Sequence, residues 1–157
     1  MLGQLNGTQI EQILHTEVVG RIGCHDAGRA YVVPITYVYH DGAIYGHSTE
    51  GQKLHMMRAN PYVCFEVEQV DDLANWRCVI AWGEFEELAG NDEQHALELL
   101  VDRLMPLMPS ATAHPEIGAH DSDRPTHGTP DRTPVLYRIV LNEKTGRFEK
   151  QERVPRH

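Results

Sequence analysis

The residues best suited to bind a ligand lie in one short polar segment, HSTEGQK at positions 47–53. This segment brings two hydroxyls, a glycine and a lysine to the place where a helix is expected to begin. Hydroxyls and the unpaired N–H groups of a helix N-terminus donate hydrogen bonds, the helix dipole adds partial positive charge, and Lys53 adds a full one. Together they suit an anionic group such as a phosphate. The alternative is that Ser48 and Thr49 are ordinary helix caps beside a surface lysine.

The surrounding chain predicts strands joined by tight turns. Runs of β-branched and aromatic residues alternate with polar ones, and the Asp41-Gly42 pair supplies the positive φ angles of a hairpin. Pro34 has no N–H group and indicates an edge or irregular strand. Strands are expected at residues 18–24, 31–39, 43–47, 62–68, 77–88 and 134–141, followed by a turn at 142–147 and a short strand at 148–152. At least six strands joined by hairpins predict a mainly β fold, an antiparallel β-barrel with peripheral helices.

Helices are expected at residues 8–15, 53–58 and 91–105, the first with a capping box between Thr8 and Glu11. The segment 106–134 differs, because it holds six prolines and three histidines and almost no large apolar residue. Such a segment buries too little apolar surface to fold alone. We therefore expect one domain, 1–157, with a long Pro/His-rich loop at about 106–134.

Length and charge bound the class of protein. A chain of 157 residues with a net charge of -9 fits one globular domain and opposes general nucleic-acid binding, which needs a basic face. No apolar run approaches the roughly 20 residues of a membrane span, and the first residues do not resemble a signal peptide. These features predict a cytoplasmic protein with neither membrane nor nucleic acid as its partner.

Cysteines and histidines predict no metal site. Cys24, Cys64 and Cys78 are odd in number, have no C-x-x-C spacing and fall in expected strands, which favours buried reduced thiols over a catalytic cysteine. His114, His120 and His127 could in principle bind a metal, but their spacing matches no compact ligand motif. A solvated loop is the preferred interpretation.

Five stretches together resemble a known family. They are VVPITYVY (32–39), DGAIYGHS (41–48), GQKL (51–54), RANPYVCFEV (58–67) and VIAWGEFEEL (79–88). Their order and spacing resemble the FMN-binding split-barrel superfamily, the fold of pyridoxamine 5′-phosphate oxidase, and within it the Nim-type nitroimidazole-resistance flavoproteins. The resemblance implies a six-stranded antiparallel split barrel. It also implies a homodimer that binds one FMN in each of two clefts at the subunit interface.

The resemblance also implies roles for particular residues. Lys53 would bind the FMN phosphate, Ser48 would donate to phosphate or ribityl oxygens, and His47 would lie near the ribityl chain or the ring. Backbone groups would line the isoalloxazine ring at Val33, Pro34, Ile35 and Thr36. The beginning of another strand, Trp76 to Cys78 with Arg77 between them, would approach the flavin bound to the other subunit of the dimer.

The chain departs from pyridoxamine phosphate oxidases, because it has neither their arginine-rich segment nor their C-terminal Arg/His signature for the substrate phosphate. Two classes of function remain. The first is an FMN-dependent oxidoreductase that passes electrons from NAD(P)H to a small-molecule substrate such as a nitro-aromatic compound. The alternative is a non-enzymatic carrier or sensor of flavin, deazaflavin or haem. No catalytic residue is assigned by the sequence.

Overall fold

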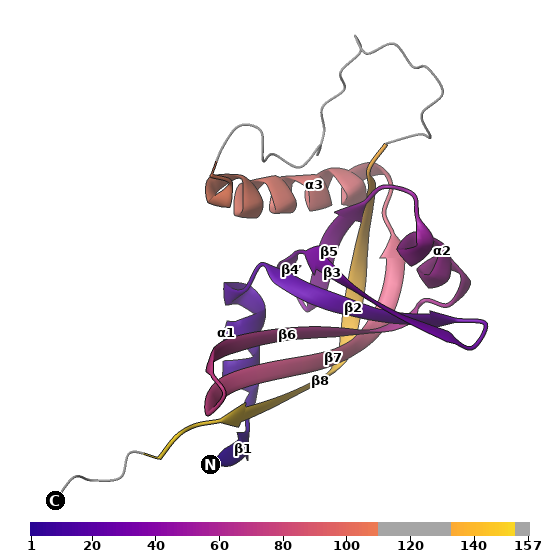
Figure 1. Cartoon of the computed structure of the whole chain (residues 1–157). Coiled ribbons are helices and arrows are strands. Elements are labelled where there is room, and N and C mark those ends of the chain that lie inside the picture. The colour runs from indigo at the N-terminus through magenta and orange to yellow at the C-terminus, as the bar shows by residue number, and fades with distance from the viewer. Residues whose placement is uncertain (110–132, 153–157) are drawn as a thin grey trace, which may run out of the picture.

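The structure is a computed structural model that describes residues 1–109 and 133–152. The helices and strands can be followed along the chain in Figure 1. They are β1 (Leu2–Gln4), α1 (Gly7–Thr16), β2 (Val19–Asp26), β3 (Arg29–Thr36), β4 (Val38–His40), β5 (Ala43–Ser48), α2 (Gln52–Ala59), β6 (Tyr62–Asp72), β7 (Asn75–Glu87), α3 (Gly90–Leu104), the 3-10 helix η1 (Met105–Leu107) and β8 (Val135–Glu149). Most of the expected 106–134 loop, including its three histidines, lies outside the described residues.

All strands belong to one antiparallel sheet. Its order is β3-β2-β6-β7-β8-β5-β4, and β1 pairs with the far end of β8. The mainly β, antiparallel fold with peripheral helices is therefore confirmed. The described sheet contains eight strands rather than six, because β1 and β4, of three residues each, join six longer strands. The two ends of the path, β3 and β4, are joined in the chain through Tyr37.

Two tight hairpins position these strands. Asp41 and Gly42 have φ angles of 46° and 74°, and Ala27 and Gly28 have 49° and 78°, so both turns have the left-handed geometry that suits the twist of antiparallel strands. The strand expected at 31–39 is divided at Tyr37. The Tyr37 ring is fully buried, and its hydroxyl donates to the Leu14 carbonyl of α1 at 2.9 Å. This contact ties the break between β3 and β4 to the first helix.

The helices cover the sheet at different places. Leu14 of α1 and Leu54, Met56 and Met57 of α2 belong to the main core, together with the inward side chains of the long strands. The third helix, α3, lies across one end of the molecule (Figure 1). It packs Ala96 and other apolar residues against β5 and β8 in a second core. Within the described residues no helix is long and apolar enough to cross a membrane.

Two local expectations are wrong. The first helix is capped by Asn6 and Gln9, not by Thr8 and Glu11: the Asn6 side chain accepts from Gln9 N at 2.9 Å, and the Gln9 side chain accepts from Asn6 N at 2.9 Å. Glu11 instead accepts a hydrogen bond from the Tyr39 hydroxyl at 3.0 Å. The capping box is the expected motif, placed two residues earlier in the chain.

The turn expected at 142–147 is absent, and β8 continues to Glu149. Trp82 pairs with Glu143 while Gly83 pairs with Leu141, so Asn142 is the extra residue of a β-bulge. Gly146 is buried, and a Cβ on it would lie 2.9 Å from the Leu5 Cβ, so this glycine permits close packing rather than a turn. The polar residues 142–145 are all exposed, but they belong to a strand and not to a turn.

A substitution at Gly83 can test how closely β7 packs against β8. A Cβ on Gly83 would lie 2.4 Å from the Val140 carbonyl oxygen, and the backbone cannot yield cheaply there. We expect Gly83→Ala to lower the free energy of unfolding by about 1–3 kcal/mol. In Gly7→Ala, the matched control, the new Cβ meets nothing within 4 Å, so the change should be neutral or stabilise by up to about 1 kcal/mol. Urea unfolding measures both, and equal effects would contradict the close approach.

Candidate functional site

The polar segment 47–53 links β5 to α2 at one side of the sheet (Figure 1). His47 and Ser48 are the last residues of β5, and Lys53 lies in the first turn of α2. Three apolar side chains of α2, Leu54, Met56 and Met57, are buried in the main core. Because this burial fixes the helix, it also fixes where Lys53 lies.

The N-terminus of α2 has no side-chain cap. Gly51 occupies the cap position, and among the described residues no side-chain cap hydrogen bond forms there. The Ser48 hydroxyl instead donates to the Thr49 carbonyl at 2.9 Å. The interpretation of Ser48 and Thr49 as ordinary caps is therefore wrong, and within residues 1–109 and 133–152 no cap side chain serves the first-turn N–H groups of α2.

Lys53 is not a surface lysine. Its side chain is half-buried, and in the part of the chain that the structure describes its ammonium forms neither an ion pair nor a hydrogen bond. The Nζ atom lies over the Tyr137 ring, 5.9 Å from the centroid. Burial lowers the Lys53 pKa from its ordinary value, and the nearby Cys24 thiol opposes this only in part. A half-buried cation with no carboxylate partner is costly unless a ligand supplies the anion.

Two buried polar atoms lie in the same region without a partner. Across residues 1–109 and 133–152, His47 Nδ1 and the Tyr137 hydroxyl are the buried side-chain polar atoms that form no hydrogen bond. Gly46 pairs with Tyr137 across β5 and β8, and a Cβ on Gly46 would lie 2.5 Å from the Tyr137 hydroxyl. The absence of a side chain at Gly46 thus makes room for this hydroxyl.

Lys53 links the other members of a set that we call the anion cluster: His47, Tyr137 and the N-terminus of α2. Tyr137 lies on the main-core face of the sheet and His47, the next pairing position, on the other face. The anion cluster offers a cation, N–H groups and two unpartnered polar side chains, and its members include no carboxylate. This donor set fits the phosphate end of a ligand. Tyr137 was missed in the sequence, where the isolated Gly46 inside a strand was the available signal of a close approach.

The four β3 residues expected to line a flavin ring lie on an edge strand. Among the described residues β3 pairs only with β2, so one edge of its backbone is unpaired. Ile35 is buried in the core and Val33 packs against it, whereas Pro34 and Thr36 are exposed on the outer face. Unpaired backbone groups are what a ring-lining strand requires, and Pro34 is on an edge strand as expected.

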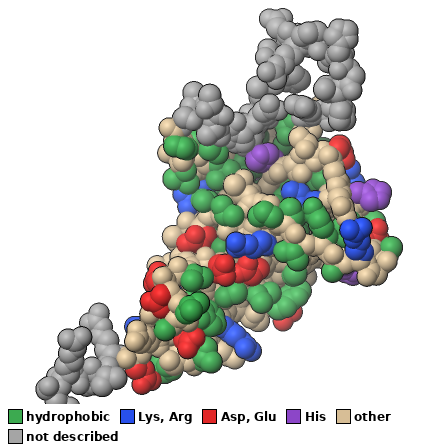
Figure 2. Space-filling model, viewed as in Figure 1, with side chains coloured by type: hydrophobic (Ala, Val, Ile, Leu, Met, Phe, Trp, Pro, Cys, Tyr) green, Lys and Arg blue, Asp and Glu red, His purple; other side chains and the backbone are tan. Residues whose placement is uncertain are grey.

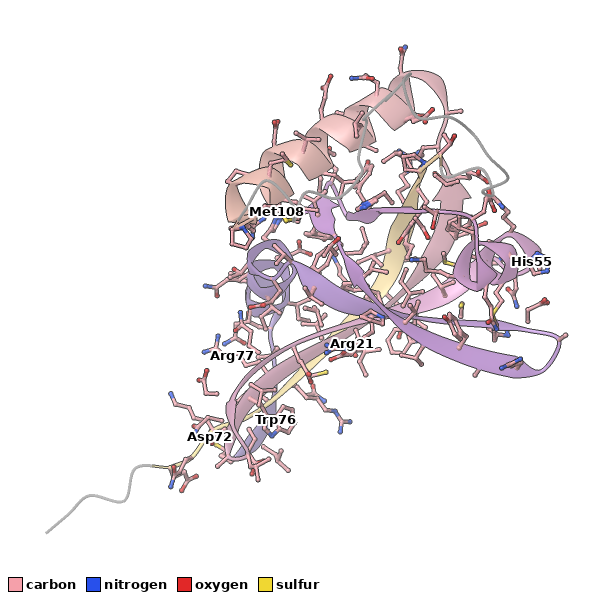
Figure 3. The ribbon with its side chains drawn as sticks, turned by 45° about the horizontal axis from the view of Figure 1, so that its top comes forward. Arg21, His55, Asp72, Trp76, Arg77 and Met108 are labelled. Atoms are coloured by element: carbon pink, nitrogen blue, oxygen red, sulfur yellow. The ribbon has the colours of Figure 1, made fainter. Side chains whose placement is uncertain are left out.

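The other three predicted residues lie elsewhere. Trp76, Arg77 and Cys78 begin β7, beside the β6–β7 hairpin. Figure 3 labels Trp76 and Arg77 at this end and His55 on α2 at the opposite side of the molecule. One chain therefore brings His47, Ser48 and Lys53 together but leaves Trp76, Arg77 and Cys78 apart from them.

The cysteines are thiols with no disulfide partner in the described residues. Cys24 is buried as expected, but Cys64 and Cys78 are only partly buried, because they alternate onto the outer face of the sheet. Burial and the neighbouring Glu66 raise the Cys78 pKa to about 11, and its Sγ lies 3.5 Å from Glu66 Oε1. Cys78 is thus a protonated thiol and a poor nucleophile at neutral pH.

His47 supplies a test of the anion cluster. Burial, reinforced by the Lys53 charge, lowers the His47 pKa, so in the folded protein this ring binds a proton less readily than in the unfolded chain. Protonation of His47 therefore favours the unfolded chain, and the free energy of unfolding falls as pH drops below about 6.5. By NMR titration we expect the His47 pKa to lie below 6.5 and to rise in Lys53→Met, with His47→Gln identifying the resonance. An unchanged value in Lys53→Met would show that the two groups do not interact.

Comparison with known proteins agrees with this architecture. A curated relative, an uncharacterized protein of Rhizobium meliloti, is 31% identical over 77 residues, so the match spans 49% of this chain and about half, 51%, of that protein. An FAD-binding protein of Mesorhizobium loti superposes with a TM-score of 0.71 at 27% identity, covering 96% of this chain and 99% of that one. A candidate 5-nitroimidazole antibiotic resistance protein of Bacteroides thetaiotaomicron gives a TM-score of 0.67 at 20% identity, covering 94% and 87%. The family profile of pyridoxamine 5′-phosphate oxidase matches residues 7–148, and the chain belongs to that family.

Proposed function

We propose that this protein binds FMN and acts as an oxidoreductase on a small electrophile such as a nitro-aromatic compound. The observation that carries the proposal is the anion cluster. In the described part of the chain it combines a half-buried Lys53 without an ion pair, a helix N-terminus without a side-chain cap, and two polar atoms without a hydrogen bond. Such an arrangement costs free energy in the empty protein and favours a ligand that brings negative charge and hydrogen-bonding oxygens. Family membership and the flavin-binding structural relative make a flavin phosphate the most economical candidate.

Particular residues would hold the cofactor. Lys53 would pair with the phosphate, and the α2 N–H groups would donate to its oxygens. The Ser48 hydroxyl would join them by exchanging its bond to the Thr49 carbonyl for one to the ligand. His47, neutral at pH 7 because burial lowers its pKa, would hydrogen-bond rather than add charge. The unpaired edge of β3, from Val33 to Thr36, would meet the ring. When bound, FMN would supply the electron-transfer chemistry, with NAD(P)H as the electron donor.

FMN is preferred to FAD because the anion cluster holds one lysine and the chain has no G-x-G-x-x-G motif for a dinucleotide. The Mesorhizobium loti relative is an FAD-binding protein, so cofactor identity needs a direct measurement. We further propose a cytoplasmic location, since an odd number of cysteines suits a reducing compartment.

The first test concerns Lys53. After denaturation, mass spectrometry of the released cofactor should give FMN; FAD, deazaflavin, haem or no cofactor would contradict the proposal. Lys53→Met should then remove a charge-assisted contact of roughly 1.5–3 kcal/mol, which is about a 10- to 150-fold loss of FMN affinity. Fluorescence titration measures this loss. Folding should hardly suffer, because methionine keeps the apolar stem and removes a desolvated charge.

Riboflavin is the matched ligand, since it lacks only the phosphate. Its affinity should barely change in Lys53→Met. Equal losses for both ligands would mean that Lys53 supports the site without touching phosphate. Stopped-flow reduction by NAD(P)H then separates an enzyme from a carrier, because a carrier would not be reduced at a useful rate.

We also propose a homodimer with the flavin at the subunit interface. On the outer face of the sheet, Val32, Tyr62, Ile80, Trp82 and Val140 expose between 39% and 71% of their surface. Figure 2 shows hydrophobic side chains reaching the surface among acidic and basic ones. An exposed apolar face of this kind favours association. A second chain could also bring Trp76, Arg77 and Cys78 to a site that they do not reach in their own chain.

The dimer predicts a mass of twice 17.8 kDa by light scattering at micromolar concentration. Trp82→Glu, which puts a charge on the outer face, should shift the mass toward the monomer and weaken flavin binding. Asn91→Asp is the control, because it adds the same charge at an exposed position of α3. A wild-type monomer that holds flavin would contradict the proposal.

A further inference from the structure

One arginine connects three parts of the chain next to the anion cluster. Arg58, near the end of α2, donates from Nη1 and Nη2 to the two carboxylate oxygens of Glu50, at 2.7 and 2.8 Å. It also donates from Nε and Nη2 to the two carboxylate oxygens of Glu87, the last residue of β7, at 2.9 and 2.8 Å. The Arg58 guanidinium thus holds the turn before α2 against the end of a central strand.

The turn from Thr49 to Gly51 lies at the surface of the molecule. All three residues are exposed, and a Cβ on Gly51 would meet only the Thr49 carbonyl, at 3.9 Å. Isolated surface ion pairs contribute little, but a bidentate arginine shared by two carboxylates has the geometry in which such pairs do contribute. Arg58 also lowers the Glu87 pKa, as expected for a carboxylate held by a cation.

We propose that Arg58 and Glu50 form a clamp that positions the turn before α2, so that Lys53 and the free N–H groups of this helix face the phosphate. This inference rests on the proposed function, since it concerns the same phosphate. Arg58 acts as a positioning residue and not as a phosphate ligand. Four of its five N–H donors are already used by the two carboxylates.

The clamp and simple electrostatics predict opposite signs for one substitution. Glu50→Gln removes a negative charge close to the anion cluster, so charge alone would tighten FMN binding. The clamp predicts weaker binding, because the charge-assisted pairing that fixes the turn is lost. We expect FMN affinity to fall about three- to tenfold while riboflavin affinity stays within about twofold.

A second variant keeps the charge and removes the geometry. Arg58→Lys retains the cation, but an ammonium cannot bind two carboxylates in the bidentate manner of guanidinium. FMN affinity should therefore fall as in Glu50→Gln. The control is Glu86→Gln, which removes the same charge from the neighbouring β7 residue and breaks its 2.7 Å contact with Arg138, a pair that involves neither Glu50 nor Arg58. Its FMN affinity should be unchanged.

The last measurement is a double-mutant cycle with Lys53→Met. If the clamp works by positioning Lys53, Glu50→Gln should weaken FMN binding less in the Lys53→Met background than in the wild type. Equal effects in both backgrounds, tighter FMN binding in Glu50→Gln, or equal losses for riboflavin would each overturn the clamp. Failure of the proposed function looks different, since wild-type protein would then bind no FMN at all.

Discussion

The fold depends on the backbone pairing of β7 with strands on both sides. This strand of 13 residues pairs with β6 and with β8 along nearly its whole length, so its N–H and C=O groups are satisfied within the sheet. Val79, Ala81 and Phe85 point into the core, while Ile80 and Trp82 lie on the outer face. A register shift of one residue would exchange these two sets, and the core therefore fixes the register. The same strand ends at Glu87, where Arg58 holds the turn before α2.

The sheet and the core beneath α2 hold the anion cluster in place. Each buried polar group without a partner costs about 1–3 kcal/mol, and a half-buried ammonium adds to that cost. The protein tolerates this because Leu54, Met56 and Met57 anchor α2 in the core and thereby carry Lys53 with them. Gly46 contributes by leaving space for the Tyr137 hydroxyl. Under the proposed function, a ligand that pairs these groups would recover much of this cost.

Local features were predictable from the sequence, and contacts between distant residues were not. The Asp41-Gly42 hairpin, the alternation in β6 and the polar segment before α2 depend on neighbouring residues, and they lie where the pattern indicates. Glycine and polar residues predict a turn at 142–147, but Gly146 packs against Leu5 in a strand. This contact joins residues far apart in the sequence, so no local pattern indicates it. The environment of the Tyr137 hydroxyl and the pairing of Arg58 with Glu87 also depend on distant residues and could not be predicted. Arg58 and Glu87 are 29 residues apart. Such features need the three-dimensional arrangement of the strands.

Family membership does not by itself fix the activity, because one fold can support many reactions. The distribution of charge around the sheet gives more specific information about the ligand. Among the described residues Lys53 has no carboxylate partner, whereas on the outer face Arg21, beside Pro34 of β3, lies within 3.6 and 3.7 Å of Glu66 and Glu68. The Lys53 ammonium is therefore left for a ligand, while the Arg21 charge is already balanced within the chain. Under the proposed function, the flavin phosphate would approach Lys53 rather than Arg21.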